Sequence, residues 1–448
     1  MSTLSPARPE PVAAPPAPRT GALRAQMRHG LGRWAGALLA ATLLVFLASD
    51  AGAWQGLWSE TQFKLHGATV LLAGPVALGA GCWSGGFDRR RGTGELLSSA
   101  ARSALRRFLM TTLPLAAWTV AGYAVATTAV LLASWPYTSA GHPDVSVLLG
   151  DAAYLVAAAV LGQVAGRLIP WRLAAPVLGV LLYALLGLSP WESPLLPSWG
   201  LWGEGDRAPW QTFVMALWLL ALAATTVLAH TARRRFLCLL TSAALALAAA
   251  ASLLGTGSPT RTDPLTTRVV CDTRIRPAVC VEASHPGLLP EVTAALRPLA
   301  GKLEGVGNLP ARWSERGGRR GGETVSLPQL MYGQEIVRNK LVDPGRWRHD
   351  AAYSLIGSDP CDARVEDVRA ARVSETVLDW LAPQRDSARE QFEEQARAEG
   401  NEKELASYAA DRAARERLRS MGTEERRAWL TRYFATRDRC DPKEVPDL

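Results

Sequence analysis

The apolar positions of the first 255 residues form long uncharged runs that alternate with short polar segments. A transmembrane α-helix needs roughly 20 mainly apolar residues to cross the hydrocarbon core of a bilayer. Seven runs approach or reach this length, at about residues 34–47, 67–86, 108–134, 152–166, 173–188, 210–228 and 236–255. The pattern predicts an α-helical polytopic membrane protein with about seven transmembrane helices, of which the first, fourth and fifth are the shortest.

Residues 1–30 precede the first run and are predicted to form a disordered cytoplasmic tail. The first 22 residues contain six prolines and almost no large apolar side chain. Such a composition cannot offset the entropy lost on ordering the chain. Because six further runs follow the first one, we interpret that run as a span rather than as a cleaved secretory signal.

The basic residues predict how the chain is oriented in the membrane. The net charge of +8 belongs to residues 1–255, which carry 18 Lys and Arg against 10 Asp and Glu, whereas residues 256–448 carry 31 of each. Sixteen of the 18 lie in four alternate segments: the tail up to Arg33, residues 87–107, residues 167–172 and residues 233–235. The positive-inside rule therefore predicts that the protein lies in the plasma membrane with its N-terminus on the cytoplasmic side. Seven crossings would place residues 256–448 in an extracytoplasmic domain, after a transmembrane domain over residues 31–255.

Charged groups and motifs restrict the function classes. No Asp, Glu, Lys, Arg or His lies in the middle of a predicted span, which argues against a self-powered secondary transporter. The chain has no phosphate-binding loop of the Walker type, so any ATP hydrolysis requires a separate subunit. The balanced charge of the C-terminal part argues against a nucleic-acid partner. No catalytic motif is recognisable, so we predict that the chain is not an enzyme and needs no cofactor.

The polar segment between the second and third runs carries the most information. Residues 87–109 read FDRRRGTGELLSSAARSALRRFL. From Glu95 onward the apolar residues recur near a 3.6-residue period, which predicts an amphipathic helix at about residues 94–107 along the inner membrane surface. Charge alone supports an interfacial helix whose arginines contact anionic membrane lipid.

A second interpretation comes from a resemblance. A basic cluster, then Gly-Thr-x-Glu-Leu-Leu, then an Arg-rich helix between the second and third spans, is similar to the coupling helix of type-2 ABC transporter permeases. The resemblance implies that this segment docks onto an ABC-type ATPase subunit, and that the permease works as a homodimer or paired with a related chain. The residues implied in the ATPase contact are Arg89, Arg90, Arg91, Gly92, Thr93, Glu95, Leu96 and Leu97. A seventh span and a C-terminal domain of 193 residues depart from that family's pattern and leave the cargo open.

Four cysteines, Cys271, Cys280, Cys361 and Cys440, lie in the predicted outer domain, where disulfides persist. Three pairings are possible. We favour Cys271 with Cys280, which flank a turn between extended segments, and then Cys361 with Cys440. A metal site that includes His285 is the alternative, but the spacing matches no zinc-ligand set.

The rest of the outer domain is predicted to be mainly helical. Residues 284–306 indicate one helix with an apolar face, and residues 365–434 indicate further helices. The Gly- and Arg-rich residues 311–323 are predicted to form a mobile loop. The competing function class is a membrane-anchored sensor or interaction protein whose outer domain binds a ligand.

Overall fold

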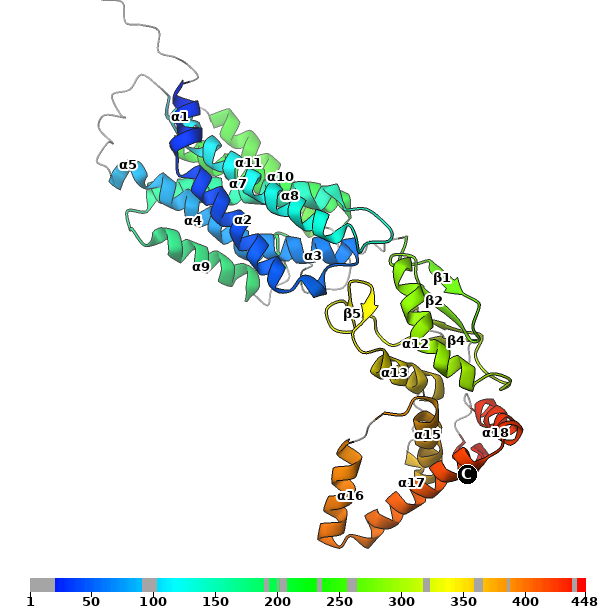
Figure 1. Ribbon diagram of the computed structural model, residues 1–448. Helices are drawn as coiled ribbons and strands as arrows, with labels where there is room; N and C mark the ends of the chain where they lie inside the picture. Colours follow the sequence, from blue (N-terminus) through cyan, green and yellow to red (C-terminus); the bar gives the residue numbers. More distant parts are fainter. Residues whose placement is uncertain are drawn as a thin grey trace, which may run out of the picture.

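The computed structural model describes residues 21–90, 103–188, 193–199, 201, 208–231, 236–255, 264–316, 323–357, 366–384, 387–436 and 441–448. These residues form an elongated molecule, with a helical bundle at one end and a C-terminal domain at the other (Figure 1). Each part has its own hydrophobic core. The core of the bundle is built from residues between Ala35 and Leu253, and that of the C-terminal domain from residues between Val279 and Val445.

The bundle contains six helical segments long and apolar enough to cross a membrane, which confirms six of the seven predicted spans as membrane-spanning candidates. The helices of the bundle are α1 Gly21–His29, α2 Gly32–Ser49, α3 Trp58–Ala68, α4 Gly74–Gly85, α5 Phe87–Arg90, α7 Ala104–Ser134, α8 Val145–Leu168, α9 Ala174–Gly187, α10 Pro209–Thr231 and α11 Phe236–Leu254. α3 continues into α4 through the π-helical turn η2 Thr69–Ala73, so that together they count as one segment. α9 corresponds to the predicted fifth span and has only 14 residues.

The start of α7 corrects one predicted boundary. The amphipathic helix was expected to end near residue 107, before a separate span from residue 108. Instead, α7 begins at Ala104, and its N-cap Ser103 accepts a hydrogen bond from the backbone N–H of Arg106. The last residues of the predicted amphipathic helix therefore belong to the first turn of the 31-residue helix α7.

Glycines bring α4 and α8 into backbone contact. Four of them recur at four-residue spacing on the two facing surfaces: Gly81, Gly85, Gly162 and Gly166. A Cβ on Gly162 would lie 2.1 Å from the carbonyl oxygen of Leu78, and one on Gly166 would lie 2.0 Å from that of Cys82. Small residues at this spacing let membrane helices pack closely through van der Waals contact. The order of these contacts shows that α4 and α8 run in the same direction.

α9 runs in the opposite direction along α4. Ala175, at its beginning, lies against Gly79 of α4, whereas Gly179 lies against Pro75, earlier in the same helix. A helix of 14 residues is about 21 Å long, which is shorter than a hydrocarbon core of roughly 30 Å. α9 alone therefore covers only part of the length of the bundle.

The chain after α9 continues toward the other end of the bundle. The indole N–H of Trp218 donates to the carbonyl oxygen of Leu195 at 3.1 Å, and buried Leu201 lies against Gly67. α10 then begins beside the start of α8, because Thr212 contacts Gly150. The chain has therefore passed from one end of the bundle to the other between α9 and α10.

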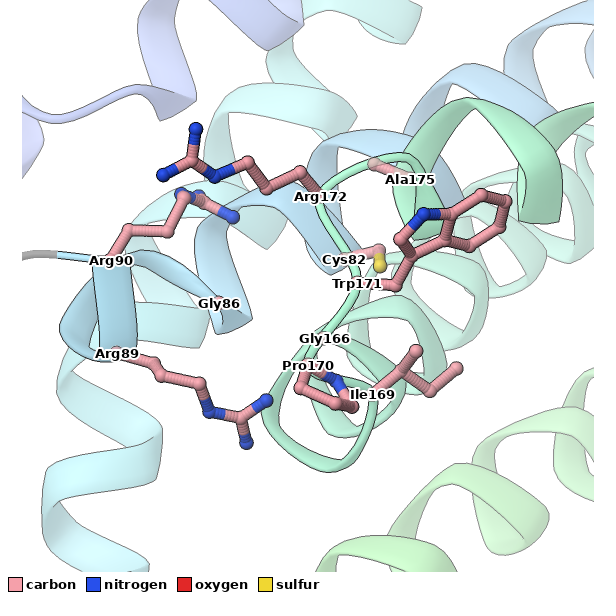
Figure 2. A pocket seen from close by; sticks show the side chains of 10 residues that line it. All are labelled: Cys82, Gly86, Arg89, Arg90, Gly166, Ile169, Pro170, Trp171, Arg172 and Ala175. Carbon is pink, nitrogen blue, oxygen red and sulfur yellow. The ribbon is translucent and has the colours of Figure 1, made fainter.

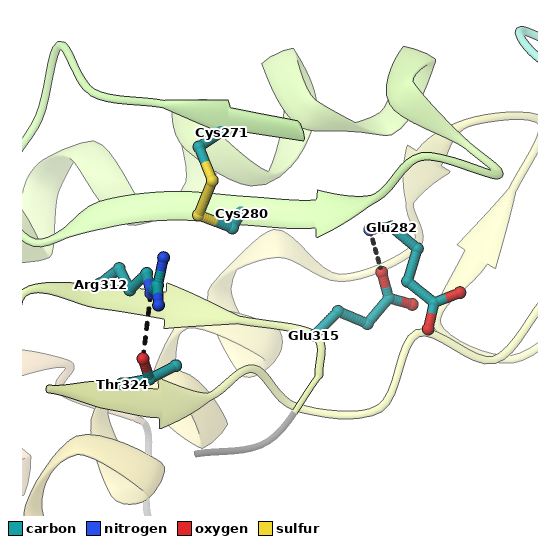
Figure 3. The surroundings of a disulfide bond; sticks show 6 residues. All are labelled: Cys271, Cys280, Glu282, Arg312, Glu315 and Thr324. Atoms are coloured by element: carbon teal, nitrogen blue, oxygen red, sulfur yellow. Dashed lines mark hydrogen bonds between the residues drawn. A yellow bond between two sulfur atoms is a disulfide. The ribbon is translucent and has the colours of Figure 1, made fainter. Parts of the chain in front are cut away.

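The C-terminal domain begins with a small sheet. β1 Val269–Asp272 pairs antiparallel with β2 Ala278–Glu282, and β3 Arg312–Ser314 and β4 Thr324–Ser326 add parallel strands in the order β1-β2-β3-β4. Cys271 faces Cys280 across the hairpin, and the predicted disulfide between them is present (Figure 3). Cys361 and Cys440 lie outside the described residues, so their predicted pairing stays a prediction.

β3 corrects the expectation of a mobile loop over residues 311–323. Its central side chain, Trp313, is fully buried, and Arg312 donates from Nε to the Thr324 hydroxyl at 3.0 Å (Figure 3). Burial of an indole excludes a large apolar surface from water and offsets the entropy of ordering a short strand. Residues 317–322 of the predicted loop lie outside the described residues.

Helices form most of the remaining C-terminal domain, as predicted. They are α12 Leu289–Lys302, α13 Pro344–Gly357, α15 Val368–Leu381, α16 Ser387–Glu399, α17 Glu402–Ser420 and α18 Thr423–Ala435. Val292, Leu296 and Leu299 of α12 are fully buried, which confirms the predicted apolar face. A short hairpin, β5 Ile336–Val337 with β6 Lys340–Leu341, precedes α13 and lies between the domain and the bundle (Figure 1).

Candidate functional site

Two of the eight predicted ATPase-contact residues lie in the described part of the chain. Arg89 and Arg90 belong to α5, which directly follows α4 at the end of the bundle away from the C-terminal domain (Figure 1). The other six, Arg91, Gly92, Thr93, Glu95, Leu96 and Leu97, lie outside the described residues. The contact as a whole therefore stays a prediction.

Both described arginines turn back onto the bundle. The guanidinium of Arg89 donates to the carbonyl oxygen of Arg167, the last basic residue of α8. The guanidinium of Arg90 donates to the carbonyl oxygen of Trp83 and lies over its indole ring, 4.3 Å from the centroid. These contacts tie α5 to the ends of α8 and α4. A force applied to the segment after Arg90 would therefore reach both helices.

A recess lies beside α5 and the α8–α9 connection (Figure 2). Arg89, Arg90 and Arg172 supply its charged lining, and Trp171 and Ile169 supply apolar rim atoms. Its cavity volume is small, about 20 Å³, and it opens to solvent. Within the part of the chain that the structure describes, none of its lining residues is acidic.

A polar network of three side chains lies inside the bundle. Asp151 of α8 is 2 % exposed, and its carboxylate lies 2.5 Å from Nδ1 of His66 in α3 and accepts the hydroxyl proton of Tyr123 in α7 at 3.1 Å. The predicted spans begin at residues 67 and 152, just after both ionisable groups. The helices begin earlier, at Trp58 and Val145, so the pair lies within them. Both residues lie in the first part of their candidate spans, so the absence of ionisable groups from the middle of a span, and the argument against self-powered transport, stay predictions.

The helix beside this network is locally widened. Pro75 has no N–H to donate to the preceding turn, and its ring collides with a regular α-helical carbonyl. The chain accommodates it through the π-helical turn Thr69–Ala73, where the Tyr154 hydroxyl donates to the carbonyl oxygen of Val70 at 3.1 Å. π-Turns inside helices are frequent at functional sites. Here the turn lies one residue beyond the helix that carries His66.

The C-terminal domain contacts the opposite end of the bundle through the hairpin β5–β6. Arg338 donates from Nε to the side-chain oxygen of Gln55 at 2.6 Å, and Asn339 donates to the carbonyl oxygen of Tyr137. The ring of Tyr332 lies against Gly56, whose φ is 137° and where a Cβ would lie 2.5 Å from the ring. Movement of the bundle end can thus be transmitted directly to the domain, and the reverse.

A half-buried acidic cluster around the buried His285 lies next to Tyr332. Nε2 of His285 is 2.8 Å from Glu315, which also accepts the backbone N–H of Glu282 at 2.9 Å (Figure 3). Burial, and then the charge of Glu315, raise the pKa of Glu282 above its usual value of 4.5. The ring of His285 meets Tyr332 edge-on at 6.1 Å. The cluster therefore supports the tyrosine that packs on the bundle.

The same residues bear on the metal and enzyme alternatives. Cys280 forms a disulfide with Cys271, so its sulfur is not available as a thiolate ligand. The described residues contain no group of three His, Cys, Asp or Glu side chains placed to hold a metal ion. The Ser284 hydroxyl lies 3.1 Å from Nδ1 of His285, so that Ser284, His285 and Glu315 form a hydrogen-bonded series. Ser284 is only 5 % exposed, which keeps its hydroxyl from a substrate.

Comparison with known proteins identified no relative. No family model matches the sequence, and no curated protein or solved structure matches it either.

Proposed function

We propose that this protein is the permease-like membrane subunit of an ABC transporter, with a separate ATPase subunit and a lipophilic or peptide-like cargo. The observation that carries the proposal is that Arg89 and Arg90 lie at the bundle end opposite to the C-terminal domain. The proposed ATPase contact and the disulfide-bonded C-terminal domain then lie on opposite sides of the membrane. This arrangement agrees with the sidedness of basic residues and with disulfides persisting outside the cytoplasm.

The mechanism would use the two helices that flank the contact segment. ATP-driven closure of the partner would push residues 91–102, which connect α5 at the end of α4 to the start of α7. α4 follows the π-turn at Thr69–Ala73, and α7 contains Pro114, so both helices have a site of local deformability. The resulting motion would reach the hairpin β5–β6 through the opposite bundle end. A homodimer, or a pair with a related chain, would enclose the cargo path.

The test is co-purification of the full-length protein in mild detergent from its native membrane, followed by identification of bound chains and an ATPase assay. A Glu95→Arg variant reverses the charge within the proposed contact. Glu404→Arg makes the same change on α17 in the C-terminal domain and serves as the matched control. The proposal expects a Walker-type ATPase with the wild type and the control, and its loss with Glu95→Arg. Absence of any ATPase from the wild-type preparation contradicts it.

A second candidate is a membrane-anchored sensor. The observation in its favour is the direct hydrogen-bonded contact between Arg338 of the C-terminal domain and Gln55 of the bundle. Ligand binding to the domain could then move the bundle without any ATPase. Retention of a non-ATPase regulator by both the wild type and Glu95→Arg would favour this function.

A further inference from the structure

The recess beside α5 gathers positive charge from two separate parts of the chain. Arg89 and Arg90 come from α5, and Arg172 comes from the connection between α8 and α9 (Figure 2). A guanidinium has five N–H donors, so Arg89 and Arg90 each keep donors after the backbone carbonyl contacts that hold them. Arg89 and Arg90 thus combine held positions with unused hydrogen-bonding capacity, and Arg172 adds a third, exposed guanidinium.

The charge in the recess is unbalanced. Among the described residues, its lining contains three arginines and no carboxylate. Like charges that converge on one space repel each other, and the repulsion is reduced when an anion lies between them. Arginine also forms paired hydrogen bonds with the oxygens of a phosphate group. The lining is therefore complementary to a phosphate ester.

The rim of the recess indicates where that phosphate comes from. Trp171 is 54 % exposed, and its neighbours Leu168 and Leu173 are 61 % and 56 % exposed. Large exposed apolar side chains next to arginines are typical of the membrane interface, where indole rings lie at headgroup level. Acyl chains can cover these residues while the headgroup reaches the arginines. A free anion would leave the apolar rim in water.

We propose that this recess is a binding site for the phosphate of an anionic phospholipid in the cytoplasmic leaflet. Arg172 and Arg90 contact the phosphate oxygens, Arg89 lies at its other side, and Trp171 packs against the upper part of the lipid. A bound lipid would join α5 to the α8–α9 connection. The site rests on the membrane orientation proposed above and shares Arg89 and Arg90 with the proposed ATPase contact. Arg172 lies outside that contact, so its substitution tests the lipid site separately.

The test measures lipid binding to the full-length protein in mild detergent. Short-chain phosphatidylglycerol is titrated, with phosphatidylcholine as the neutral lipid and inorganic phosphate as the free anion, and the thermal midpoint gives an apparent Kd. Arg172→Gln removes one charge of the recess. Arg33→Gln removes one charge from α2 at the same bundle end, outside the recess, and is the matched control.

We expect phosphatidylglycerol to stabilise the protein more than phosphatidylcholine, and inorganic phosphate to do so only at far higher concentration. Arg172→Gln should weaken phosphatidylglycerol binding about fivefold, which corresponds to roughly 1 kcal/mol for a basic residue at the membrane surface. Arg33→Gln should change it less than twofold. Equal weakening by both variants overturns the site in favour of diffuse attraction. If inorganic phosphate binds as tightly as phosphatidylglycerol, the assignment of the ligand as a lipid is overturned. If phosphatidylglycerol binds no more tightly than phosphatidylcholine, both the phosphate site and the lipid assignment are overturned.

The lipid-binding test and the ATPase co-purification test can succeed or fail independently of each other. Arg172→Gln should still co-purify with the ATPase, whereas Glu95→Arg should lose the ATPase and keep lipid binding. Loss of lipid binding in Arg172→Gln without any bound ATPase in the wild type would support the lipid site and contradict the transporter proposal.

Discussion

The buried carboxylate of Asp151 offers a sharp test of how the bundle is held together. Asp151→Ala removes the acceptor of two contacts, from Nδ1 of His66 at 2.5 Å and from the Tyr123 hydroxyl at 3.1 Å. These contacts join α8 to α3 and to α7. Loss of the carboxylate leaves a ring nitrogen and a hydroxyl without their partner inside the bundle.

The magnitude follows from burial. Leaving a buried hydrogen-bonding group without its partner costs about 1–3 kcal/mol, whereas interhelical hydrogen bonds in a membrane protein average about 0.6 kcal/mol. The side chain of Asp151 is 2 % exposed, but that of His66 is 19 % exposed, so water can replace part of its contact. We therefore expect a loss of about 2 kcal/mol, in the middle of the first range. Asp151→Asn keeps an acceptor for Tyr123 and should lose less.

The assay is pulse proteolysis of the purified protein across a titration of SDS into mild-detergent micelles, which measures the unfolded fraction. Asp144→Ala is the matched control, because Asp144 caps the same helix by accepting the backbone N–H of Ser146 at 2.8 Å. Loss of an N-cap costs about 1 kcal/mol. If Asp151→Ala destabilises the bundle no more than Asp144→Ala does, the pair adds little and the reasoning is refuted.

Three further predictions concern the rest of the chain. Replacing Cys271 and Cys280 together by Ser should lower the unfolding free energy of the C-terminal domain by about 2–3 kcal/mol, as expected for opening a short loop, and denaturant titration with and without reductant measures it. Glu282→Gln should stabilise that domain at pH 7, because the raised pKa of Glu282 means that its ionised form destabilises the folded state. The stability difference between the variant and the wild type should shrink as the pH falls toward 4.5, where Glu282 becomes protonated. A stability difference that does not change with pH contradicts this prediction. Gly162→Leu should separate α8 from α4, because a Cβ there would lie 2.1 Å from the carbonyl oxygen of Leu78, and a fully folded, monodisperse variant on size exclusion would contradict this.

Sequence alone was sufficient to locate six of the seven predicted spans as membrane-spanning candidates, but not to place their ends. A backbone in lipid must satisfy its own hydrogen bonds, so an uncharged apolar run predicts a helix. The ends depend on partners that are distant in sequence. Gln62 donates to the carbonyl oxygen of Asp144 at 2.8 Å, and the Thr61 and Ser134 hydroxyl oxygens share a hydrogen bond at 2.9 Å. These polar side chains find partners inside the bundle, so helix α3 begins nine residues before the apolar run does.

The same limit applies to the sites. The His66–Asp151 pair was missed because its members are separated by 85 residues and each lies beside a predicted span rather than in it. β3 was missed because its pairing with β2 and β4, not its own composition, orders it. A signal was present in Trp313, a large apolar residue in a Gly- and Arg-rich segment. The recess arginines were visible in sequence as a basic cluster, but their convergence with Arg172 required the fold.

The central claim is that the arginine end of the bundle is cytoplasmic and the C-terminal domain is outside, which requires α9 and the chain after it to complete a crossing. The most direct measurement is a series of reporter fusions after residues 173, 208 and 448 in a bacterial host, each to alkaline phosphatase, active outside the cytoplasm, and to green fluorescent protein, fluorescent inside. The account predicts fluorescence at 173 and phosphatase activity at 208 and 448. Fluorescence at 208 and 448 would show that α9 does not cross and that the C-terminal domain is cytoplasmic, which contradicts the account.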